Sequence, residues 1–458
     1  MKKKLSLFSL GLLIIAAIDS IRNLPASALF GSSLIFFFLF AAVIFLIPIA
    51  LISAQMTAQY PDKGGVYHWV KQAFGEKFAF LAILLQWINT IIWYPTILSF
   101  IAGTLAYLLD PKLANNPQYL AAMILSIFWA LTLISFKGIH FSAKINNICA
   151  LLGTIFPMTL LIVFGGLWVI FGQPIQIKFS WSEIFPNFDY FENFTSLTAV
   201  MASYLGMELA GVHITEVRNP QKNFPKVLLL SAAFILLTML LGSLSIAFVI
   251  PEKEINLVAG VVQVFDRFFS EFGLSSLTPF IALAIVLGST GGIINWLTSP
   301  AKGLFEAAEL GYLPKIFQKK NQQDVPTMIM LLQAVIVTIV CLSFIFLKSV
   351  NTFYWFLTAL STNLYMMMYI LLFASAIKLN YRHAFKDCTF KLSSSRFGLK
   401  FLAILGIFGC ALTVIVGFFP PRELMISDLL SYCLWMMISM IASIAFSLLF
   451  FAYKKKET

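Results

Sequence analysis

A carboxylate lies between glycines inside an apolar stretch of the sequence, GMELAGVHITEVRNP (206–220). Gly206 and Gly211 bracket Glu208, and His213 follows. An ionisable side chain inside an apolar segment indicates a substrate or proton pathway by default. The alternative is a packing role in which His213 satisfies Glu208, but residues five apart are poorly aligned on a regular helix. We therefore expect Glu208 to act in substrate or proton coupling, because a buried carboxylate can load and release a proton.

A second pair of charges interrupts the first apolar stretch, LLIIAAIDSIRNLPASALF (12–30). Asp19 and Arg22 each cost roughly 2.5–3.5 kcal/mol at the centre of a membrane helix, so neither is expected to face lipid. Pro25 removes a backbone donor and frees carbonyls near Ile18 to Ile21, which is tolerated only beside a cavity or inside protein. Asp19 and Arg22 are three residues apart, and two roles stay open: a mutual ion pair, or an Arg22 free to attract a substrate carboxylate.

Membrane helices are the elements that must position these charges. Hydrophobic residues make up 60% of the chain and charged residues only 11%, against about 25% in a soluble domain. One crossing needs about 20 apolar residues, whereas a barrel strand needs about ten that alternate. The sequence therefore predicts an all-α polytopic protein with about twelve spans, at 5–31, 33–58, 77–108, 118–137, 144–172, 194–217, 226–250, 275–298, 326–347, 352–377, 398–420 and 426–453.

The basic residues predict the orientation of these spans. Of the 31 Lys and Arg residues, 24 fall at the termini and in loops on one side, 6 on the other side, and Arg22 within the first span. The positive-inside rule then places both termini in the cytoplasm. The net charge of +11 reflects this topology and gives no support to nucleic-acid binding. The N-terminal stretch also resembles a signal peptide ending at Ala26-Ser27-Ala28, but Asp19 and Pro25 interrupt it, so we favour a first span.

The two interrupted spans are the first and the sixth. An offset of five spans makes them run in opposite directions, as in an inverted repeat of five helices, and such paired breaks point to a transporter's midplane site. We expect one transmembrane transporter domain (1–458), with repeats at 5–172 and 194–377 and two additional helices at 398–453. Half-helix N-termini favour a carboxylate and unwound carbonyls favour an ammonium group, so this site suits a zwitterion.

Four stretches together resemble the amino acid–polyamine–organocation superfamily: YPDKGGVYHWVKQAFG (60–75), GMELAGVHITEVRNPQKNFPK (206–226), GSLSIAFVIPEKEINLVAGVVQVF (242–265) and WLTSPAKGLFEAAELGYLP (296–314). The pattern E-x-x-N-P-x-K-x-F-P at 216–225 marks the superfamily, and VIPEKEINLVAG at 249–260 is similar to its glutamate:GABA antiporter family. This resemblance implies a leucine-transporter-like fold of two inverted five-helix repeats plus two helices. It also implies exchange of amino acids or their decarboxylation products across the inner membrane.

The resemblance carries over to particular residues. Tyr365 and Tyr369 match tyrosines that line the substrate path, and Trp296 matches an aromatic gate. A packed aromatic stripe remains the alternative for the tyrosines, which share a helix face, and an interfacial anchor remains the alternative for Trp296. The chain departs from the family at Gly292, where a glutamate antiporter is expected to carry glutamate. The candidate substrate-binding residues are Asp19, Ser20, Ile21, Arg22, Tyr204, Gly206, Trp296, Tyr365 and Tyr369, and the candidate proton-coupling residue is Glu208.

The expected function is secondary active amino acid transport in the bacterial inner membrane, as an antiporter with glutamate/GABA-like exchange by alternating access. The alternatives are a proton- or sodium-coupled symporter of other specificity and a non-transporting amino acid sensor on the same scaffold. We expect no enzymatic activity, cofactor or metal, because the sequence holds no nucleophile–base constellation and its four histidines lack metal-ligand spacing. The expected partners are an amino acid and the lipid bilayer, and the oligomeric state is left open.

One segment between the seventh and eighth spans is amphipathic, LVAGVVQVFDRFFSE (257–271). Such a segment predicts a helix that lies over the outer opening of the protein. Its adjacent phenylalanines, Phe268 and Phe269, are alternatively expected to anchor it at the membrane interface.

Overall fold

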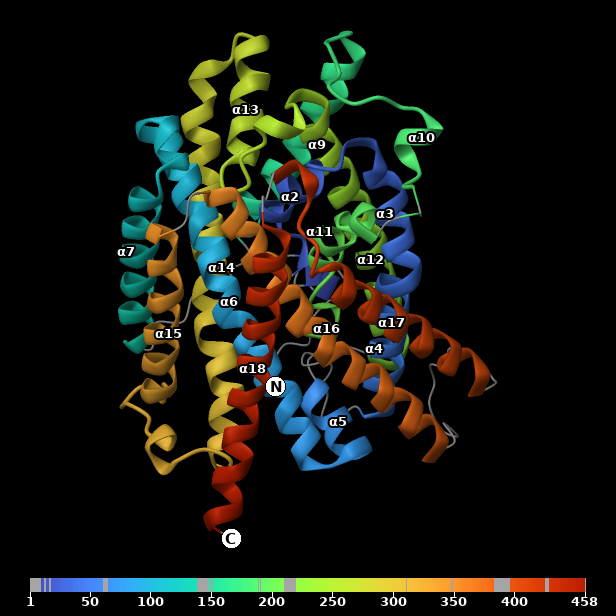
Figure 1. Ribbon diagram of the computed structural model, residues 1–458, viewed down its shortest axis with the longest axis vertical. Helices are drawn as coiled ribbons and strands as arrows, with labels where there is room; N and C mark the ends of the chain where they lie inside the picture. Colours follow the sequence, from blue (N-terminus) through green and yellow to red (C-terminus); the bar gives the residue numbers. More distant parts are fainter. Residues whose placement is uncertain are drawn as a thin grey trace.

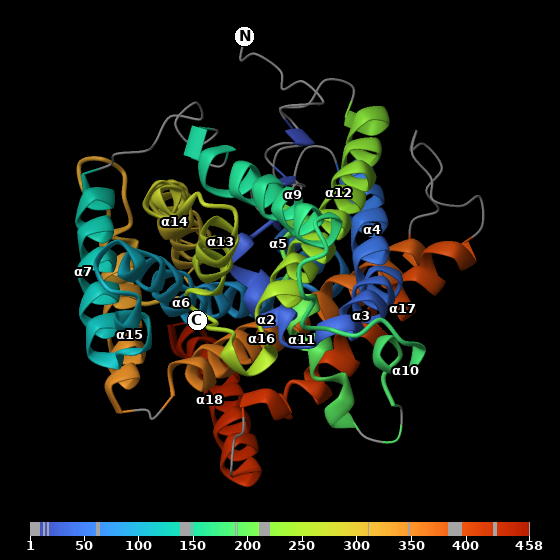
Figure 2. The same ribbon diagram turned by 90° about the horizontal axis from the view of Figure 1, so that it is seen from above.

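A computed structural model describes residues 10–11, 14–15, 18–60, 65–137, 148–149, 151–187, 189, 191–209, 220–309, 311–346, 349–382, 396–424 and 428–457. Helices dominate this part of the chain, and it holds no strand. Most of the long helices run along the long axis of the molecule (Figure 1). Figure 2 shows α7 and α15 at one side, α4 and α17 at the other, and α2, α11 and α16 near the middle.

The long helices occur in the order of the predicted spans, but α12 begins at Pro220 rather than at 226, and α14 ends at Glu309 rather than at 298. In chain order the helices are α2 (Leu24–Ala28), α3 (Leu34–Ala41), α4 (Ile47–Gln59), α5 (Val66–Phe74), α6 (Glu76–Leu109), α7 (Pro117–Phe136), α9 (Phe156–Ile170), α10 (Trp181–Ile184), α11 (Ser196–Ala202), α12 (Pro220–Val249), α13 (Gly260–Glu271), α14 (Thr278–Glu309), α15 (Thr327–Phe346), α16 (Val350–Arg382), α17 (Arg396–Val416) and α18 (Leu429–Glu457). Two π-helical turns, η3 (Ala42–Leu46) and η5 (Leu151–Ile155), precede α4 and α9.

Within the described residues, nine helical segments are long and apolar enough to cross a membrane. A shorter apolar stretch, Ser275–Gly291, covers the first part of α14. The first and sixth spans complete the predicted set of about twelve, and both are interrupted. The all-α polytopic fold is confirmed.

The first span breaks at Asp19 and Ser20. The Asp19 N–H still donates to the carbonyl of Ile15 at 2.7 Å, so the preceding helix ends there. Ser20 then has an extended backbone (φ −107°, ψ 107°), and the chain resumes as a 3₁₀ turn, η1 (Ile21–Asn23), that leads into α2. Pro25 lies in the first turn of α2, where its missing N–H has no helical partner to lose. The proline therefore begins the second half of the span, just after the break.

The sixth span breaks after α11. Residues 203–206 form a turn that ends at Gly206, whose φ of 107° lies in a region that side chains other than glycine rarely adopt. A short 3₁₀ turn holds Glu208, and α12 is the next described helix. His213, which the alternative of a packing role pairs with Glu208, lies outside the described residues.

The predicted external helix is α13, and its apolar face packs onto the protein. Phe268 lies 5.6 Å from the ring of Trp168, and Phe269 lies 5.4 Å from the ring of Phe164, both on α9. Both phenylalanines are buried, so the alternative of an interfacial anchor is wrong for them. A Cβ added to Gly260 would lie 2.8 Å from Pro25, which places the start of α13 directly against α2.

Two glycines let α14 and η5 touch backbone to backbone. A Cβ added to Gly288 would lie 2.1 Å from the Cα of Gly153. We expect Gly288→Ala to lower the thermal unfolding midpoint of the detergent-purified protein by several degrees, because overpacking costs about 1–3 kcal/mol. The matched control is Gly166→Ala in α9, where the added Cβ meets nothing within 4 Å. Equal midpoints for the two variants, measured by intrinsic fluorescence, would contradict this packing.

Candidate functional site

The carboxylate of Glu208 accepts hydrogen bonds from two tyrosines of α16. The Tyr365 hydroxyl donates to Oε1 at 2.7 Å, and the Tyr369 hydroxyl donates to Oε2. The four-residue spacing of the tyrosines places both on one face of the helix, toward the break in the sixth span. The structure thus brings together three of the residues predicted from the sequence. The hydroxyls of both tyrosines donate to Glu208, which the alternative of a packed aromatic stripe does not predict.

The surroundings of Glu208 close it off from solvent. Its side chain is 1% exposed, and the Tyr369 hydroxyl also accepts from the Gly206 N–H at 2.8 Å. Gln86 of α6 donates to the Tyr365 hydroxyl at 3.1 Å, and the Phe45 ring lies edge-on to Tyr369 at 4.9 Å. Since tyrosine hydroxyls both donate and accept, this arrangement can hold the carboxyl group in either protonation state.

The breaks in the first and sixth spans touch each other. The side-chain amide of Asn23 in η1 donates to the Ala202 carbonyl at the end of α11, at 3.3 Å. A Cβ added to Gly206 would lie 3.5 Å from Ile18. The half-helices predicted to share a site are therefore neighbours.

Tyr204 joins the sixth-span break to the second span. Its hydroxyl donates to the Phe38 carbonyl in α3 at 3.2 Å, and the two rings meet edge-on at 5.9 Å. Its role in substrate binding stays a prediction, because its polar group is engaged away from Glu208.

Arg22 is held by neutral groups. Its Nη1 donates to the Thr96 hydroxyl of α6 at 2.7 Å and to the Tyr354 hydroxyl of α16 at 3.4 Å. The guanidinium carbon lies 5.5 Å from the centre of the Trp93 ring, within range of a cation–π contact. No acidic side chain of the described residues pairs with it.

Asp19 faces a different helix from Arg22. Its Oδ2 accepts from the Thr238 hydroxyl of α12 at 3.1 Å, and its buried Oδ1 has no partner among the described residues. Asp19 and Arg22 do not pair, because the extended Ser20 between them interrupts the helix that would align them. The mutual ion pair is therefore wrong, and the alternative of an unpaired Arg22 agrees with the structure.

The remaining predicted residues are placed less directly. Ile21 is buried next to the first break. Trp296 and Gly292 belong to the backbone of α14, but the Trp296 side chain lies outside the described part of the chain. Sequence reasoning missed several polar partners of the site, and the only signal they give is a polar residue type inside an apolar span: Asn23, Gln86, Thr96, Thr238 and Tyr354.

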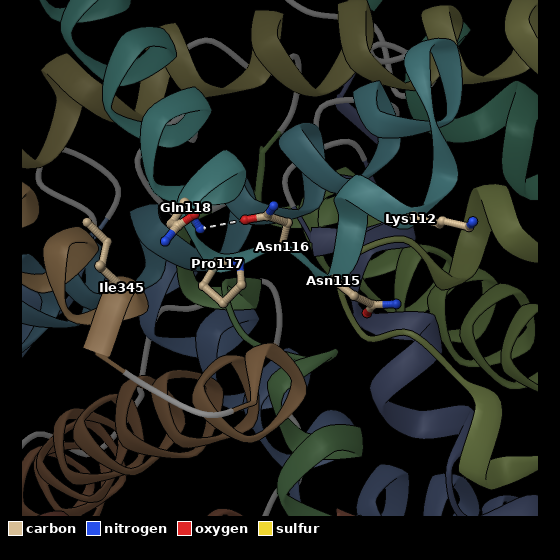
Figure 3. A pocket seen from close by; sticks show the side chains of 6 residues that line it. All are labelled: Lys112, Asn115, Asn116, Pro117, Gln118 and Ile345. Atoms are coloured by element: carbon tan, nitrogen blue, oxygen red, sulfur yellow. Dashed lines mark hydrogen bonds between the residues drawn. The ribbon is translucent and has the colours of Figure 1, made fainter.

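Two surface hollows lie away from this site. One of about 400 Å³ is lined by residues around the start of α7 and by Ile345 of α15 (Figure 3). The other, of about 340 Å³, lies between the segment preceding α13 and the first turn of α16, and Asn256 and Asn351 are among its lining residues. Neither is lined by a predicted site residue, and no cluster of metal-ligating side chains occurs in the part of the chain that was described.

Comparison with known proteins decides the family. The family model described as amino acid permease matches residues 5–455. The chain belongs to the amino acid permease family. The permease is 39% identical to an uncharacterized transporter of Legionella pneumophila over 93% of this chain and 92% of that protein. It is 30% identical to the glutamate/gamma-aminobutyrate antiporter of Lactococcus lactis (96% and 89%) and 23% identical to a probable agmatine/putrescine antiporter of the same species (86% and 83%).

The predicted resemblance is thereby confirmed. The permease is a multi-pass membrane protein of a bacterial transporter family, and its partner is a small-molecule substrate. Its transport function rests on the family match over nearly the whole chain and on the antiporters among its relatives.

Proposed function

We propose that the permease is an antiporter of the bacterial inner membrane that exchanges an amino acid for a related amine, with glutamate and GABA as the first candidates. The relatives whose names state a substrate pair are antiporters for glutamate and gamma-aminobutyrate or for agmatine and putrescine. Glutamate and GABA both carry an ammonium group and a carboxylate, so a site that binds a charged nitrogen and a carboxylate suits this pair. Exchange proceeds by alternating access around the two breaks, with the predicted repeats 5–172 and 194–377 moving against each other.

One observation carries the proposal: the Glu208 carboxylate, held by Tyr365 and Tyr369, lies in a helix break that contacts the break of the first span. Peptide groups around Ser20 and residues 203–206 have left regular helical geometry, and such backbone at membrane depth is stable only beside protein or a cavity. Glu208 supplies a negative charge for the substrate's ammonium group, or a proton acceptor when that group departs.

The two ends of the molecule support the proposed orientation. The helices α10 and α13 lie at one end, and α5 and the C-terminus at the other (Figure 1). The segment that holds α5 and the C-terminal segment both fall on the side that the sequence predicts to be basic, so the positive-inside rule places that end in the cytoplasm.

Counterflow in proteoliposomes tests the proposal. Vesicles loaded with one unlabelled compound are expected to accumulate the same labelled compound well above empty liposomes, with L-glutamate and GABA each driving uptake of the other. A panel of acidic, neutral and cationic amino acids, scanned over pH, defines the specificity. Uptake that needs a sodium or proton gradient but no internal amino acid would instead indicate a symporter.

A further inference from the structure

Arg22 is a buried cation whose hydrogen bonds are incomplete. Its side chain is 5% exposed, and Nη1 is the only side-chain nitrogen that donates a hydrogen bond to a described residue. The buried Nε has no partner among the described residues, and none of their hydrogen bonds uses Nη2. Nε and Nη2 form one edge of the guanidinium fork, the geometry that binds a carboxylate through two parallel hydrogen bonds. A buried charge without a counter-ion is expensive, so a vacant fork at this depth points to an anionic ligand.

The position of Arg22 relative to Glu208 can be read from two helices that contact both. Along α6, Gln86 donates to the Tyr365 hydroxyl that binds Glu208, and Thr96 accepts from Arg22. Along α16, Tyr365 donates to Glu208, and Tyr354 accepts from Arg22. Separations of ten and eleven residues correspond to about 15 Å and about 16 Å at the helical rise of 1.5 Å per residue. The partners of the two groups therefore lie at different depths along the same two helices, about three turns apart.

Arg22 is the group nearer to the α13 end. Asn351, in the first turn of α16, donates to the Ile255 carbonyl at 3.0 Å and accepts from the Leu257 N–H at 2.9 Å. Tyr354 follows Asn351 by one turn, so Arg22 lies just beneath the segment that leads into α13. The hollow of about 340 Å³ lies at this same junction, with Asn351 and Asn256 in its lining.

We propose that Arg22 forms an outer carboxylate-binding subsite, which receives the substrate from the α13 side before it reaches Glu208. This proposal rests on the proposed antiport function and adds a residue that selects carboxylate-bearing substrates on one side of the membrane. The hydroxyls of Thr96 and Tyr354 hold one edge of the guanidinium and leave the other edge for the ligand. Because the partners of the two groups on α6 are about 15 Å apart along the helix, we expect the substrate to occupy the two subsites in succession.

Sided kinetics test this subsite. Exchange of labelled L-glutamate, or of the amino acid that the counterflow panel selects, is measured in right-side-out and inside-out membrane vesicles. We expect Arg22→Gln to raise KM at least about tenfold from the α13 side, the effect of losing one charge-assisted hydrogen bond. From the α5 side, KM is expected to change less than about threefold, because the substrate meets Glu208 first. Arg22→Lys keeps the charge but loses the two-pronged guanidinium geometry. Its KM from the α13 side is expected to lie between those of the unmodified protein and Arg22→Gln.

The control is Lys112→Gln, which removes an exposed cation at the same end of the molecule and is expected to leave both KM values unchanged. Thermal unfolding of each variant separates a folding defect from a binding defect. An unchanged KM in Arg22→Gln, or an equal rise from both sides, would overturn the subsite while leaving antiport intact. Failure of the unmodified protein to exchange any amino acid would remove the proposed function, and the subsite with it.

Discussion

Glu208→Gln is expected to remove the pH dependence of exchange and to lower its maximal rate at least about tenfold. Glutamine preserves the shape of the side chain: its amide oxygen can accept from one tyrosine, and its amide nitrogen can donate to the hydroxyl of the other. It carries neither a charge nor a titratable proton. A tenfold loss corresponds to about 1.4 kcal/mol, which is modest for a charged group at a buried site. The measurement is homoexchange of a labelled substrate in proteoliposomes between pH 5 and 8.

A matched variant isolates the role of this carboxylate. Glu183 in α10 is exposed, and Glu183→Gln removes the same charge without touching the site. It is expected to keep both the rate and the pH profile of the unmodified protein. A Glu208→Gln protein with full, pH-dependent exchange would show that the acid has only a packing role.

Gly206→Ala is expected to reduce the rate of exchange at least about tenfold, although the variant still folds. The φ of 107° at Gly206 is a conformation that alanine rarely adopts, and such strain costs of order 1–3 kcal/mol. Relief of the strain would move the N–H that donates to Tyr369 and, with it, the hydroxyl that holds Glu208. Initial rates of exchange, normalised to the amount of reconstituted protein, measure the loss.

Its control is Gly273→Ala, in the turn after α13. Gly273 also has a positive φ, of 69°, and an added Cβ there meets nothing within 4 Å. This variant is expected to lose a little stability and no transport. Near-normal exchange by Gly206→Ala, or an equal loss in both variants, would mean that the shape of the sixth-span break is unimportant.

The features that hydropathy and backbone chemistry control could be predicted from the sequence. Apolar runs of membrane-spanning length predict spans, and charges with glycine or proline inside a run predict where regular helix fails. Asp19 and Gly206 were located in this way, and the structure interrupts both spans there. The family resemblance predicts that Tyr365 and Tyr369 line the substrate path, whereas their spacing alone also allows a packed stripe. Their hydrogen bonds to Glu208 are a finding of the structure.

The partners of the charged residues could not be predicted. Asp19 and Arg22 are three residues apart, which suits a pair on a regular helix, but the break turns them toward different helices. Thr96 and Tyr354 lie far from Arg22 in the chain, and a hydroxyl in an apolar span gives no sign of which group it will bind. The contact between Asn23 and Ala202 depends in the same way on how the two half-helices pack.

The proposed function requires that two oppositely directed spans lose helical geometry at mid-membrane and share one substrate. A cryo-electron microscopy structure in lipid nanodiscs, at a saturating concentration of the best-exchanged amino acid, tests it most directly. We expect ligand density between the backbone at Ser20–Arg22 and the backbone at 203–206, within hydrogen-bond reach of Glu208. Two continuous helices through these positions, or ligand bound away from both Glu208 and Arg22, would contradict this arrangement.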